Sequence, residues 1–443
     1  MDRKKEMAMN IRQIALRILD EYEAGGKFIN LALSTHLTDG LSREEKAALT
    51  VLIYTTVERK LTYDYHICAL SKRSESNIEL HTKNILRLGL CQILDMTSVP
   101  DFAAVNESVK LARTPGEKSF VNGVLRCAVR QKDNMPMPSE EKNYRRYLSV
   151  KYSFPLSIVK HFDALYGRED TERLLSFYND YKYTDITVNT NKISLEDYRE
   201  RLLEEDYHVL VNYSSPISLR IRGSVNPERL PGFKDGLFFV QDVASVISAG
   251  VLDPEEDSLI VDVCAAPGGK SFAAAILSGG KSRIHSFDIH ESKLSLIRSG
   301  AERLGLYNIT VAQRDATNPD TELVGKADRV ICDAPCSGLG VLGKKPDLRY
   351  KDLSNMEELN ALQLSILTAS STYLKSGGYM VYSTCTLNPA ENRDIVEKFL
   401  SENPDFEAVP FEVDNLMAKD GMLTLLPHYQ LCDGFFIAKI RRK

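Results

Sequence analysis

The chain has 443 residues, of which 43% are hydrophobic and 26% charged, so it can bury a large core and is not a disordered protein. Its 56 Lys and Arg against 61 Asp and Glu give a net charge of -5, which excludes a basic surface for nucleic acid over the whole chain. The first part is nevertheless mildly basic, since Met1 to Arg130 holds 19 basic and 16 acidic residues. This asymmetry favours a polyanion contact in that part.

Membrane and metal sites are not expected. No segment reaches the about 20 apolar residues of a membrane span, and the start MDRKKEMAMN leads into an amphipathic pattern rather than a signal peptide. We therefore expect a cytoplasmic protein with no membrane contact. The eight cysteines form no CxxC pair and the eight histidines no HxxxH or HExxH spacing, so we expect no metal and free thiols.

Residues 1–135 predict an all-α domain. Apolar residues lie at helical spacing over 11–19, and the pattern repeats over 44–57 and 85–94. The segment 131–143 contains two prolines and several charges, which indicates a linker.

Residues 145–235 predict a small α+β domain. The segment 157–165 reads as a helix and the alternation over 185–191 as a strand. Ser194, with Asp197 three residues later, is a plausible N-cap of a second helix. Two more strands are expected, at 208–213 and 218–223.

Residues 237–443 predict an α/β domain with a doubly wound sheet. Five short apolar runs are expected as strands: 258–264, 283–289, 308–312, 327–332 and 379–384. Helical segments at 292–304 and 356–374 lie between them, and 406–409 and 435–440 are candidates for the last strands. Such alternation indicates parallel strands joined by helices, and ligands then bind at the carboxyl ends of the strands.

The loop after the first of these strands has features of a nucleoside site. It follows Asp262 and contains Gly268 and Gly269, and Lys270 opens the next helix. Glycines let the backbone approach a ligand, although an ordinary tight turn would look the same. Asp288 ends the next strand, where a ribose diol would sit. The glycine spacing matches neither an ATP loop nor a good dinucleotide loop, so ATP and NAD are less expected.

The later strand ends carry carboxylates and thiols. Asp315, after the third strand, could accept a hydrogen bond from an adenine amino group or be a solvated loop residue. The fourth strand ends in ICDAPCSGLG, with Asp333 and Cys336, and the fifth in YSTCTLNPAEN, with Cys385. A single cysteine is most often a packing residue. Two at the ends of adjacent strands favour thiol chemistry.

Taken together, these motifs carry a resemblance over the whole chain. DVCAAPGGKS, FDIH, DAPCSGLG and YSTCTLNPAEN resemble the cytosine-C5 RNA methyltransferases, and FVQDVAS at 239–245 matches the block before their cofactor loop. The first helices, RQIALRIL through FVNGVLR, are similar to the NusB-like RNA-binding domain of the Sun/RsmB branch, which methylates 16S ribosomal RNA. One departure is KKPDLRY at 344–350, where that branch more often has two arginines, a histidine, Pro-Asp and a final tryptophan.

The resemblance implies a Rossmann-like class I methyltransferase domain that uses S-adenosylmethionine. It implies that Cys385 attacks C6 of cytosine, that Asp333 holds the base edge and stabilises the adduct, and that Cys336 acts in product release. A loop or bulge of 16S ribosomal RNA is then the expected substrate and a monomer the expected state. The implied cofactor contacts are Cys264, Ala265, Ala266, Pro267, Gly268, Gly269, Lys270, Asp288, Asp315 and Asp333.

Several points stay open at this stage. Lys270 could lie between cofactor and base or form a structural ion pair. A basic run after the fourth strand could hold phosphates or be a solvated loop: Lys344, Lys345, Arg349 and Lys351. Candidates for an RNA face in the first domain are Arg12, Arg73, Lys83, Arg87, Arg126 and Arg130.

Three other functions remain as alternatives. A DNA cytosine-C5 methyltransferase would use Cys336 as its nucleophile. A related enzyme could act on transfer RNA or 23S ribosomal RNA. A non-catalytic NusB-like RNA-binding factor could carry an inactive tail.

Overall fold

The computed structural model describes residues 10–25, 29–37, 40–180, 183–211, 214–223, 225–351 and 355–443. Contacts divide the chain into two compact units. Unit 1 comprises Met1–Asn179 and Leu342–Lys351, and unit 2 comprises Asp180–Val341 and Asp352–Lys443. The three-part division expected from the sequence stays a prediction. In the described ranges, no helix is long and apolar enough to cross a membrane.

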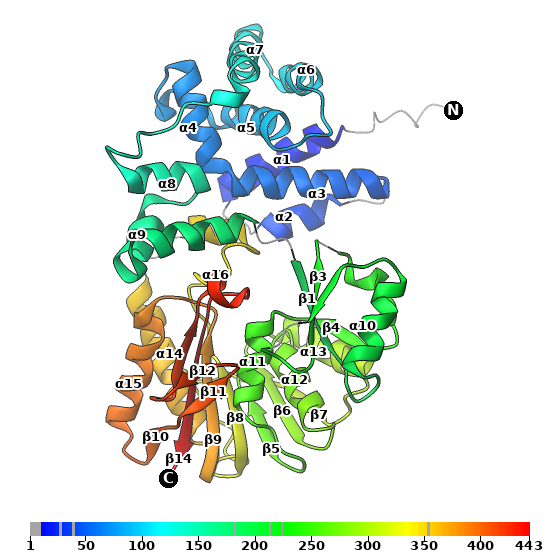
Figure 1. Ribbon diagram of the computed structural model, residues 1–443, viewed down its shortest axis with the longest axis vertical. Coiled ribbons are helices and arrows are strands. Elements are labelled where there is room, and N and C mark those ends of the chain that lie inside the picture. Colours follow the sequence, from blue (N-terminus) through cyan, green and yellow to red (C-terminus); the bar gives the residue numbers. More distant parts are fainter. Residues whose placement is uncertain are drawn as a thin grey trace. The chain divides into compact units, whose positions relative to one another are not determined.

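Unit 1 begins with a bundle of helices, as predicted. Helix α5 is the central one, because almost every residue from Asn84 to Ile93 is buried against its neighbours. Ser42 caps α3 by accepting from Glu45 N, and the Glu45 side chain accepts in return from Ser42 N. The helices are α1 Ile11–Gly25, α2 Ile29–His36, α3 Arg43–Glu58, α4 Lys60–Ser71, α5 Leu80–Leu94, α6 Asp101–Leu111 and α7 Pro115–Arg130 (Figure 1).

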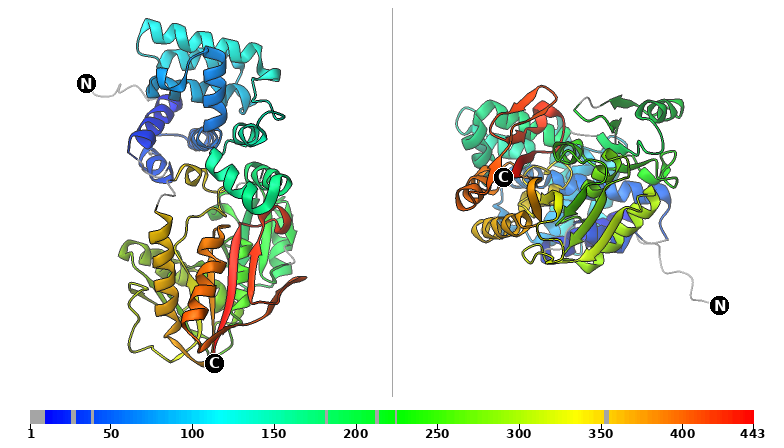
Figure 2. Two further views of the ribbon diagram at one scale, coloured as in Figure 1. Left: turned by 90° about the vertical axis from the view of Figure 1, so that its left-hand side faces the viewer. Right: turned by 90° about the horizontal axis from the view of Figure 1, so that it is seen from below.

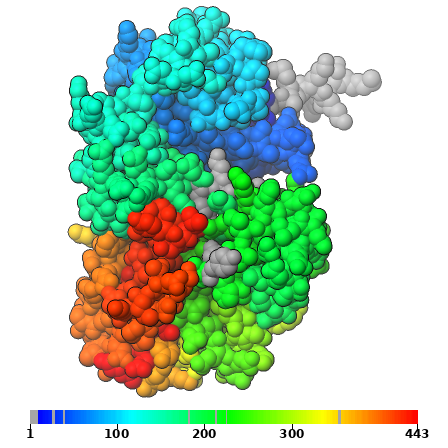
Figure 3. Space-filling view, in the orientation of Figure 1, coloured from blue at the N-terminus to red at the C-terminus, as the bar shows by residue number. Residues whose placement is uncertain are grey.

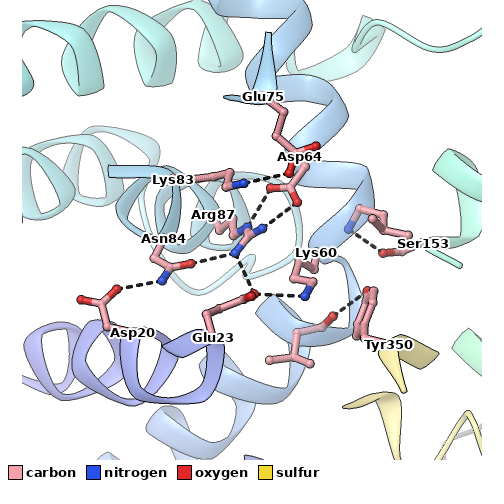
Figure 4. Close-up of polar contacts among 12 residues, drawn as sticks. Asp20, Glu23, Lys60, Asp64, Glu75, Lys83, Asn84, Arg87, Ser153 and Tyr350 are labelled. Carbon is pink, nitrogen blue, oxygen red and sulfur yellow. Dashed lines mark hydrogen bonds and ion pairs between the residues drawn. The ribbon is translucent and has the colours of Figure 1, made fainter. Parts of the chain in front are cut away.

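A buried polar cluster in this bundle corrects part of the expected RNA face. Figure 4 shows Arg87 between two acidic side chains, donating through Nε and Nη2 to Asp64 at 2.7 Å each and through Nη1 to Glu23 at 3.0 Å. The Arg87 side chain is only 4% exposed, so it holds helices together and does not face RNA. Lys83 is paired with Glu75 at 2.8 Å. Arg126 and Arg130 are exposed and remain candidates.

Unit 1 also contains residues placed elsewhere by the sequence pattern. Two further helices belong to it, α8 Tyr144–Tyr152 and α9 Leu156–Asp180, and α9 is interrupted at Gly167, whose φ is 77°. The short helix η4, Pro346–Tyr350, packs here too. Arg349 is buried, with its guanidinium 3.9 Å from the centre of the Phe154 ring. Its burial fits neither expectation for this residue, because a buried guanidinium neither holds RNA phosphates nor lies in a solvated loop.

Unit 2 contains a small antiparallel sheet with the strand order β2-β3-β1-β4. Ser194 caps the helix α10, Leu195–Glu204, by accepting from Asp197 N at 3.1 Å, as predicted. The end of the expected strand at 212–213 lies outside the described residues. The strands are β1 Tyr183–Val188, β2 Val209–Val211, β3 Ser218–Arg222 and β4 Phe238–Val240.

The large sheet of unit 2 has the order β10-β14-β9-β8-β5-β6-β7, with β13 also paired to β14. Strands β5 to β9 are parallel, which confirms the predicted doubly wound core, whereas β14 is antiparallel to β9. The strands are β5 Leu259–Asp262, β6 Arg283–Asp288, β7 Ile309–Gln313, β8 Ala327–Asp333, β9 Leu374–Thr384, β10 Phe406–Ala408, β13 Met422–Leu425 and β14 Phe435–Arg442.

Helices cover both faces of this sheet because side chains alternate along each strand. Ile260 and Ile331 pack with one set of helices, α11 Val243–Val251, α12 Gly269–Leu277 and α13 Glu291–Leu304. Val261 and Val330 pack with the other set, α14 Met356–Ser371 and α15 Arg393–Glu402, which run beside each other (Figure 2).

The short elements near the end of the chain include a hairpin that packs against α11. They are the hairpin of β11 Phe411–Val413 and β12 Leu416–Ala418 and the short helix α16, Pro427–Gln430. Helix α16 lies on the surface, seen in red in Figure 3. Its Tyr429 is accordingly more than half exposed.

Candidate active site

The carboxyl ends of four parallel strands bring the predicted site residues to one edge of the large sheet. Strands β6, β5, β8 and β9 are neighbours in that order. They end at or next to Asp288, Asp262, Asp333 and Cys385. The sequence prediction that chemistry gathers at this edge is in keeping with this topology.

The loop between β5 and α12 depends on its two glycines. Gly268 has a φ of 113°, and a Cβ there would lie 2.3 Å from the ring of Phe272. A Cβ on Gly269 would lie 2.7 Å from Nε2 of Gln241, a residue of the FVQDVAS block. A larger residue at position 268 would strain the backbone and displace the Phe272 ring, whereas one at position 269 would displace the end of the Gln241 side chain.

Asp288 connects this loop to the end of β6. Its Oδ2 accepts from Ala266 N at 3.3 Å and its Oδ1 from His290 N at 2.9 Å. The Ala265 amide also donates to Phe287 O at 2.7 Å. Hydrogen bonds therefore join the loop after β5 to the end of β6, with the Asp288 carboxylate between them.

Asp262 and Asp315 have opposite environments. Asp262 is fully buried, and burial raises its pKa to about 7, although the Ser271 hydroxyl donates to it at 2.7 Å. Asp315 accepts from Thr317 N at 2.9 Å and from the Thr317 hydroxyl at 2.7 Å. These hydrogen bonds lower the pKa of Asp315. Its carboxylate thus caps its own loop, and its expected contact with adenine stays a prediction.

Asp333 is held from two sides. Lys270 Nζ lies 2.7 Å from its Oδ2, and the Ser383 hydroxyl donates to its Oδ1 at 2.8 Å. Lys270 is largely buried, with its ammonium 5.1 Å from the centre of the Phe435 ring. Of the two expectations for Lys270, the ion pair is present, and its partner is a predicted catalytic residue.

The two thiols meet at the ends of β8 and β9. Cys336 Sγ lies 3.2 Å from Cys385 Sγ, and both residues are partly exposed. The hydrogen bond with Cys385 and burial hold the pKa of Cys336 well above its usual value. The Gly340 amide donates to Cys385 O at 2.9 Å, and a Cβ on Gly340 would lie 1.8 Å from Gly434 O. Close backbone packing thus fixes the loop that carries Cys336.

Three other cysteines are packing residues with a raised pKa. Burial raises the pKa of Cys91 and of Cys332 to about 12 each. Burial also raises the pKa of Cys264, which the resemblance placed among the cofactor contacts. The pKa of Cys336 is raised as well, so what distinguishes Cys336 and Cys385 is their contact at the ends of adjacent strands.

Glu391 lies within the motif YSTCTLNPAEN, but the sequence pattern predicts no role for it. Glu391 is fully buried and receives hydrogen bonds from the loops of both thiols. The available signal was an acidic residue in the turn after Cys385. In the described part of the chain, no group of three or more His, Cys, Asp or Glu side chains could hold a metal ion.

Comparison with family models and known proteins shows which family the chain belongs to. The model of the 16S rRNA methyltransferase RsmB/F family matches residues 249–441, and the NusB family model matches residues 9–130. The "Probable ribosomal RNA small subunit methyltransferase B" of Synechocystis sp. is 34% identical over 98% of this chain and 100% of that protein. The chain belongs to the ribosomal RNA small subunit methyltransferase B family. The protein of the same name from Bacillus subtilis is 33% identical over 98% of this chain and 99% of its own length.

Solved structures share the fold. The crystal structure of PH0851 matches with a TM-score of 0.78 at 24% identity, over 99% of this chain and 100% of that chain. A methyltransferase homolog from Pyrococcus horikoshii matches with a TM-score of 0.60 at 26% identity, over 68% of this chain and 99% of that chain. The predicted NusB-like and Rossmann-like parts are confirmed. S-adenosylmethionine, also predicted, is the methyl donor of this methyltransferase family.

Proposed function

We propose that this methyltransferase transfers a methyl group from S-adenosylmethionine to C5 of a cytosine in 16S ribosomal RNA, through a covalent bond between Cys385 and C6. The observation that carries the proposal is the 3.2 Å distance between the Cys336 and Cys385 sulfurs beside Asp333. The names of the relatives, as small-subunit ribosomal RNA methyltransferases, support the substrate.

The residues at the sheet edge fit the cofactor. The Asp288 carboxylate, at the end of β6, suits a ribose diol, and the glycine loop at the start of α12 suits a close ligand and its carboxylate. The cofactor would be held by Cys264 to Lys270, Asp288, Asp315 and Asp333. S-adenosylmethionine supplies a methyl group on a positively charged sulfur.

The protein must first make C5 of cytosine nucleophilic. Addition of the Cys385 thiolate to C6 moves electron density to C5, which can then attack the methyl group. Two thiols 3.2 Å apart do not ionise together, so one of them is the nucleophile and the other keeps its proton. By the resemblance to the cytosine-C5 RNA methyltransferases, Cys385 is the attacking thiol, in contrast to a DNA-type enzyme.

Asp333 and Cys336 serve the remaining steps. Asp333, oriented by Lys270 and Ser383, hydrogen-bonds the base edge and stabilises charge that develops on the ring. After transfer, a base accepts the proton from C5, the electron pair of that C–H bond forms the C5–C6 double bond, and the C6–S bond breaks to expel the Cys385 thiolate. Cys336 acts in this release. A loop or bulge suits the substrate because the base must leave its stack.

The direct test maps 5-methylcytosine after incubation with 16S ribosomal RNA from cells that lack the enzyme. Cys385→Ala should abolish turnover, and Cys336→Ala should accumulate a covalent protein–RNA adduct, seen on a denaturing gel. An adduct with Cys385→Ala instead would exchange the roles of the two thiols. Methylation of 23S or transfer RNA, but not of 16S RNA, would overturn the substrate.

Cofactor binding separates an enzyme from an RNA-binding factor with an inactive tail. Calorimetry with S-adenosylmethionine should give saturable heat of binding. No heat at millimolar cofactor would favour the non-catalytic alternative.

A further inference from the structure

Glu391 lies between the two loops that carry the thiols. It is fully buried, in the short helix η5, Pro389–Glu391, that follows Cys385. From the Cys336 side, Ser337 donates to it twice, through the backbone N at 2.7 Å and the hydroxyl at 2.6 Å. One carboxylate therefore binds the residue directly after Cys336 through both main chain and side chain.

The same carboxylate binds the Cys385 side and a helix. Thr386 and Asn388 donate to Oε1, at 3.2 Å each, and Gln363 of α14 donates to Oε2 at 3.2 Å. Gln363 Nε2 also donates to Pro335 O at 2.9 Å, just before Cys336. The two thiol loops and α14 thus meet at a single side chain.

This arrangement needs a carboxylate. An ionised carboxyl group only accepts hydrogen bonds, which matches five donors, whereas a Gln side chain would turn an amide N–H toward some of them. In the described residues no Lys or Arg forms an ion pair with Glu391, so these donors must compensate for burying the group. Leaving them unmatched would be costly, and the loops would separate.

We propose that Glu391 is a positioning residue, which holds the Cys336 loop against the Cys385 loop so that the two sulfurs stay in contact through addition and release. The role of Glu391 in the reaction rests on the proposed function. Its role in keeping the two sulfurs in contact does not depend on that function and can be measured without RNA or cofactor.

The test is the rate at which Cys336 and Cys385 form a disulfide in the full-length protein. Diamide takes up the two electrons and two protons that the thiols lose as the S–S bond forms, and peptide mass spectrometry quantifies this pair. Glu391→Gln should slow the reaction about tenfold or more, because small displacements of reacting groups cost large factors in rate. Equal rates in Glu391→Gln and the wild type would overturn the proposal, as would a wild type in which the pair forms no faster than other cysteine pairs.

The matched control is Asp185→Asn, which changes another buried carboxylate of unit 2. Asp185 accepts from Arg220 Nε at 2.6 Å between β1 and β3. These strands belong to the small sheet, whereas the thiol loops follow β8 and β9 of the large sheet. It should lower the melting temperature without changing the disulfide rate. An equal slowing in this control would assign the effect to general loosening and reject the positioning role. If Glu391→Gln does not fold, Ser337→Ala, which removes one donor, should give a smaller slowing.

Activity provides the second readout. Glu391→Gln should lower kcat by about tenfold or more with KM for S-adenosylmethionine unchanged, and some protein–RNA adduct should accumulate. If Glu391→Gln forms the disulfide slowly and the wild type methylates no RNA, the proposed function is refuted and the positioning role stands. Methylation at the wild-type rate by Glu391→Gln would refute the positioning role alone.

Discussion

The ion pair between Lys270 and Asp333 joins α12 to the strand that leads to Cys336. Lys270 is the second residue of α12, and Asp333 is the last residue of β8. The largely buried ammonium orients that carboxylate together with the Ser383 hydroxyl. Residue by residue, the site is therefore a set of pairs that orient one another rather than isolated groups.

Replacement of Lys270 should impair the chemistry more than cofactor binding. In Lys270→Met, Asp333 loses its partner, and kcat should fall about 100-fold, as for other oriented polar groups in active sites. Steady-state kinetics at saturating S-adenosylmethionine measures this. The control is Lys281→Met, because Lys281 pairs with Glu256 on the surface. Unchanged kcat in Lys270→Met would mean that the pair is only structural.

Asp262 should make stability depend on pH. Its pKa rises from 3.8 to about 7 in the folded chain because it is buried. Between these two pKa values the folded state therefore binds more protons than the unfolded state. As the pH rises from about 4 to about 7, Asp262 lowers the unfolding free energy by up to about 4 kcal/mol. The variant Asp262→Asn cannot ionise at this position. The unfolding free energy of Asp262→Asn should therefore increase relative to that of the wild type between about pH 4 and pH 8.

Urea unfolding of the cofactor-free protein at several pH values measures this difference. Asp315→Asn is the control, because hydrogen bonds lower the pKa of Asp315. The stability that ionised Asp315 contributes is present above its unfolded pKa and is lost only as the pH falls through its lowered pKa. The difference in unfolding free energy between Asp315→Asn and the wild type should therefore stay constant between about pH 4 and pH 8. A flat difference for Asp262→Asn as well would show that its carboxyl ionises normally in the folded chain.

At the scale of elements, the start of α12 is the part of the site that should tolerate substitution least. Gly268→Ala places a Cβ at a φ of 113° and 2.3 Å from the buried Phe272 ring. We expect a loss of about 2–4 kcal/mol in unfolding free energy, from backbone strain and overpacking, together with weaker cofactor binding. Thermal unfolding and calorimetry measure the two effects.

Gly250→Ala is the matched control for this change. Gly250 lies in α11, and a Cβ there meets nothing within 4 Å. Alanine should therefore stabilise that helix slightly, by about 0.5–1 kcal/mol. Similar melting temperatures for Gly268→Ala and the wild type would mean that the loop can adopt another shape.

Local sequence patterns predicted most of these elements but not the contacts that cross them. Strand and helix periodicity placed β5 to β9, and the order of parallel strands brought Asp288, Asp333 and Cys385 to one edge. Periodicity cannot show pairing between distant residues, so the burial of Arg87 and Arg349 was missed. The same limit hid Glu391, whose partners Gln363 and Ser337 lie 28 and 54 positions away.

For the whole molecule, the chain passes from unit 1 to unit 2, returns to unit 1 for Leu342–Lys351, and ends in unit 2. The returning segment follows the Cys336 loop in sequence. Within unit 1, Arg349 donates to the carbonyl oxygens of Leu342, Glu58 and Tyr152, at 3.2, 3.3 and 3.4 Å. The Tyr350 hydroxyl donates to Val57 O at 3.1 Å. The helical unit is thus completed by residues from a distant part of the sequence.

Arg349 should therefore matter for stability and not as a phosphate contact. Arg349→Ala removes a side chain that is 1% exposed, its hydrogen bonds to three carbonyl oxygens and its Phe154 contact. The melting temperature should therefore fall, with a loss of about 2–4 kcal/mol in unfolding free energy. Lys345→Ala is the control, because Lys345 is exposed in the same segment. Differential scanning calorimetry compares the two with the wild type. An unchanged transition for Arg349→Ala, combined with weaker binding of 16S RNA at low salt, would restore the original expectation that this residue holds phosphates.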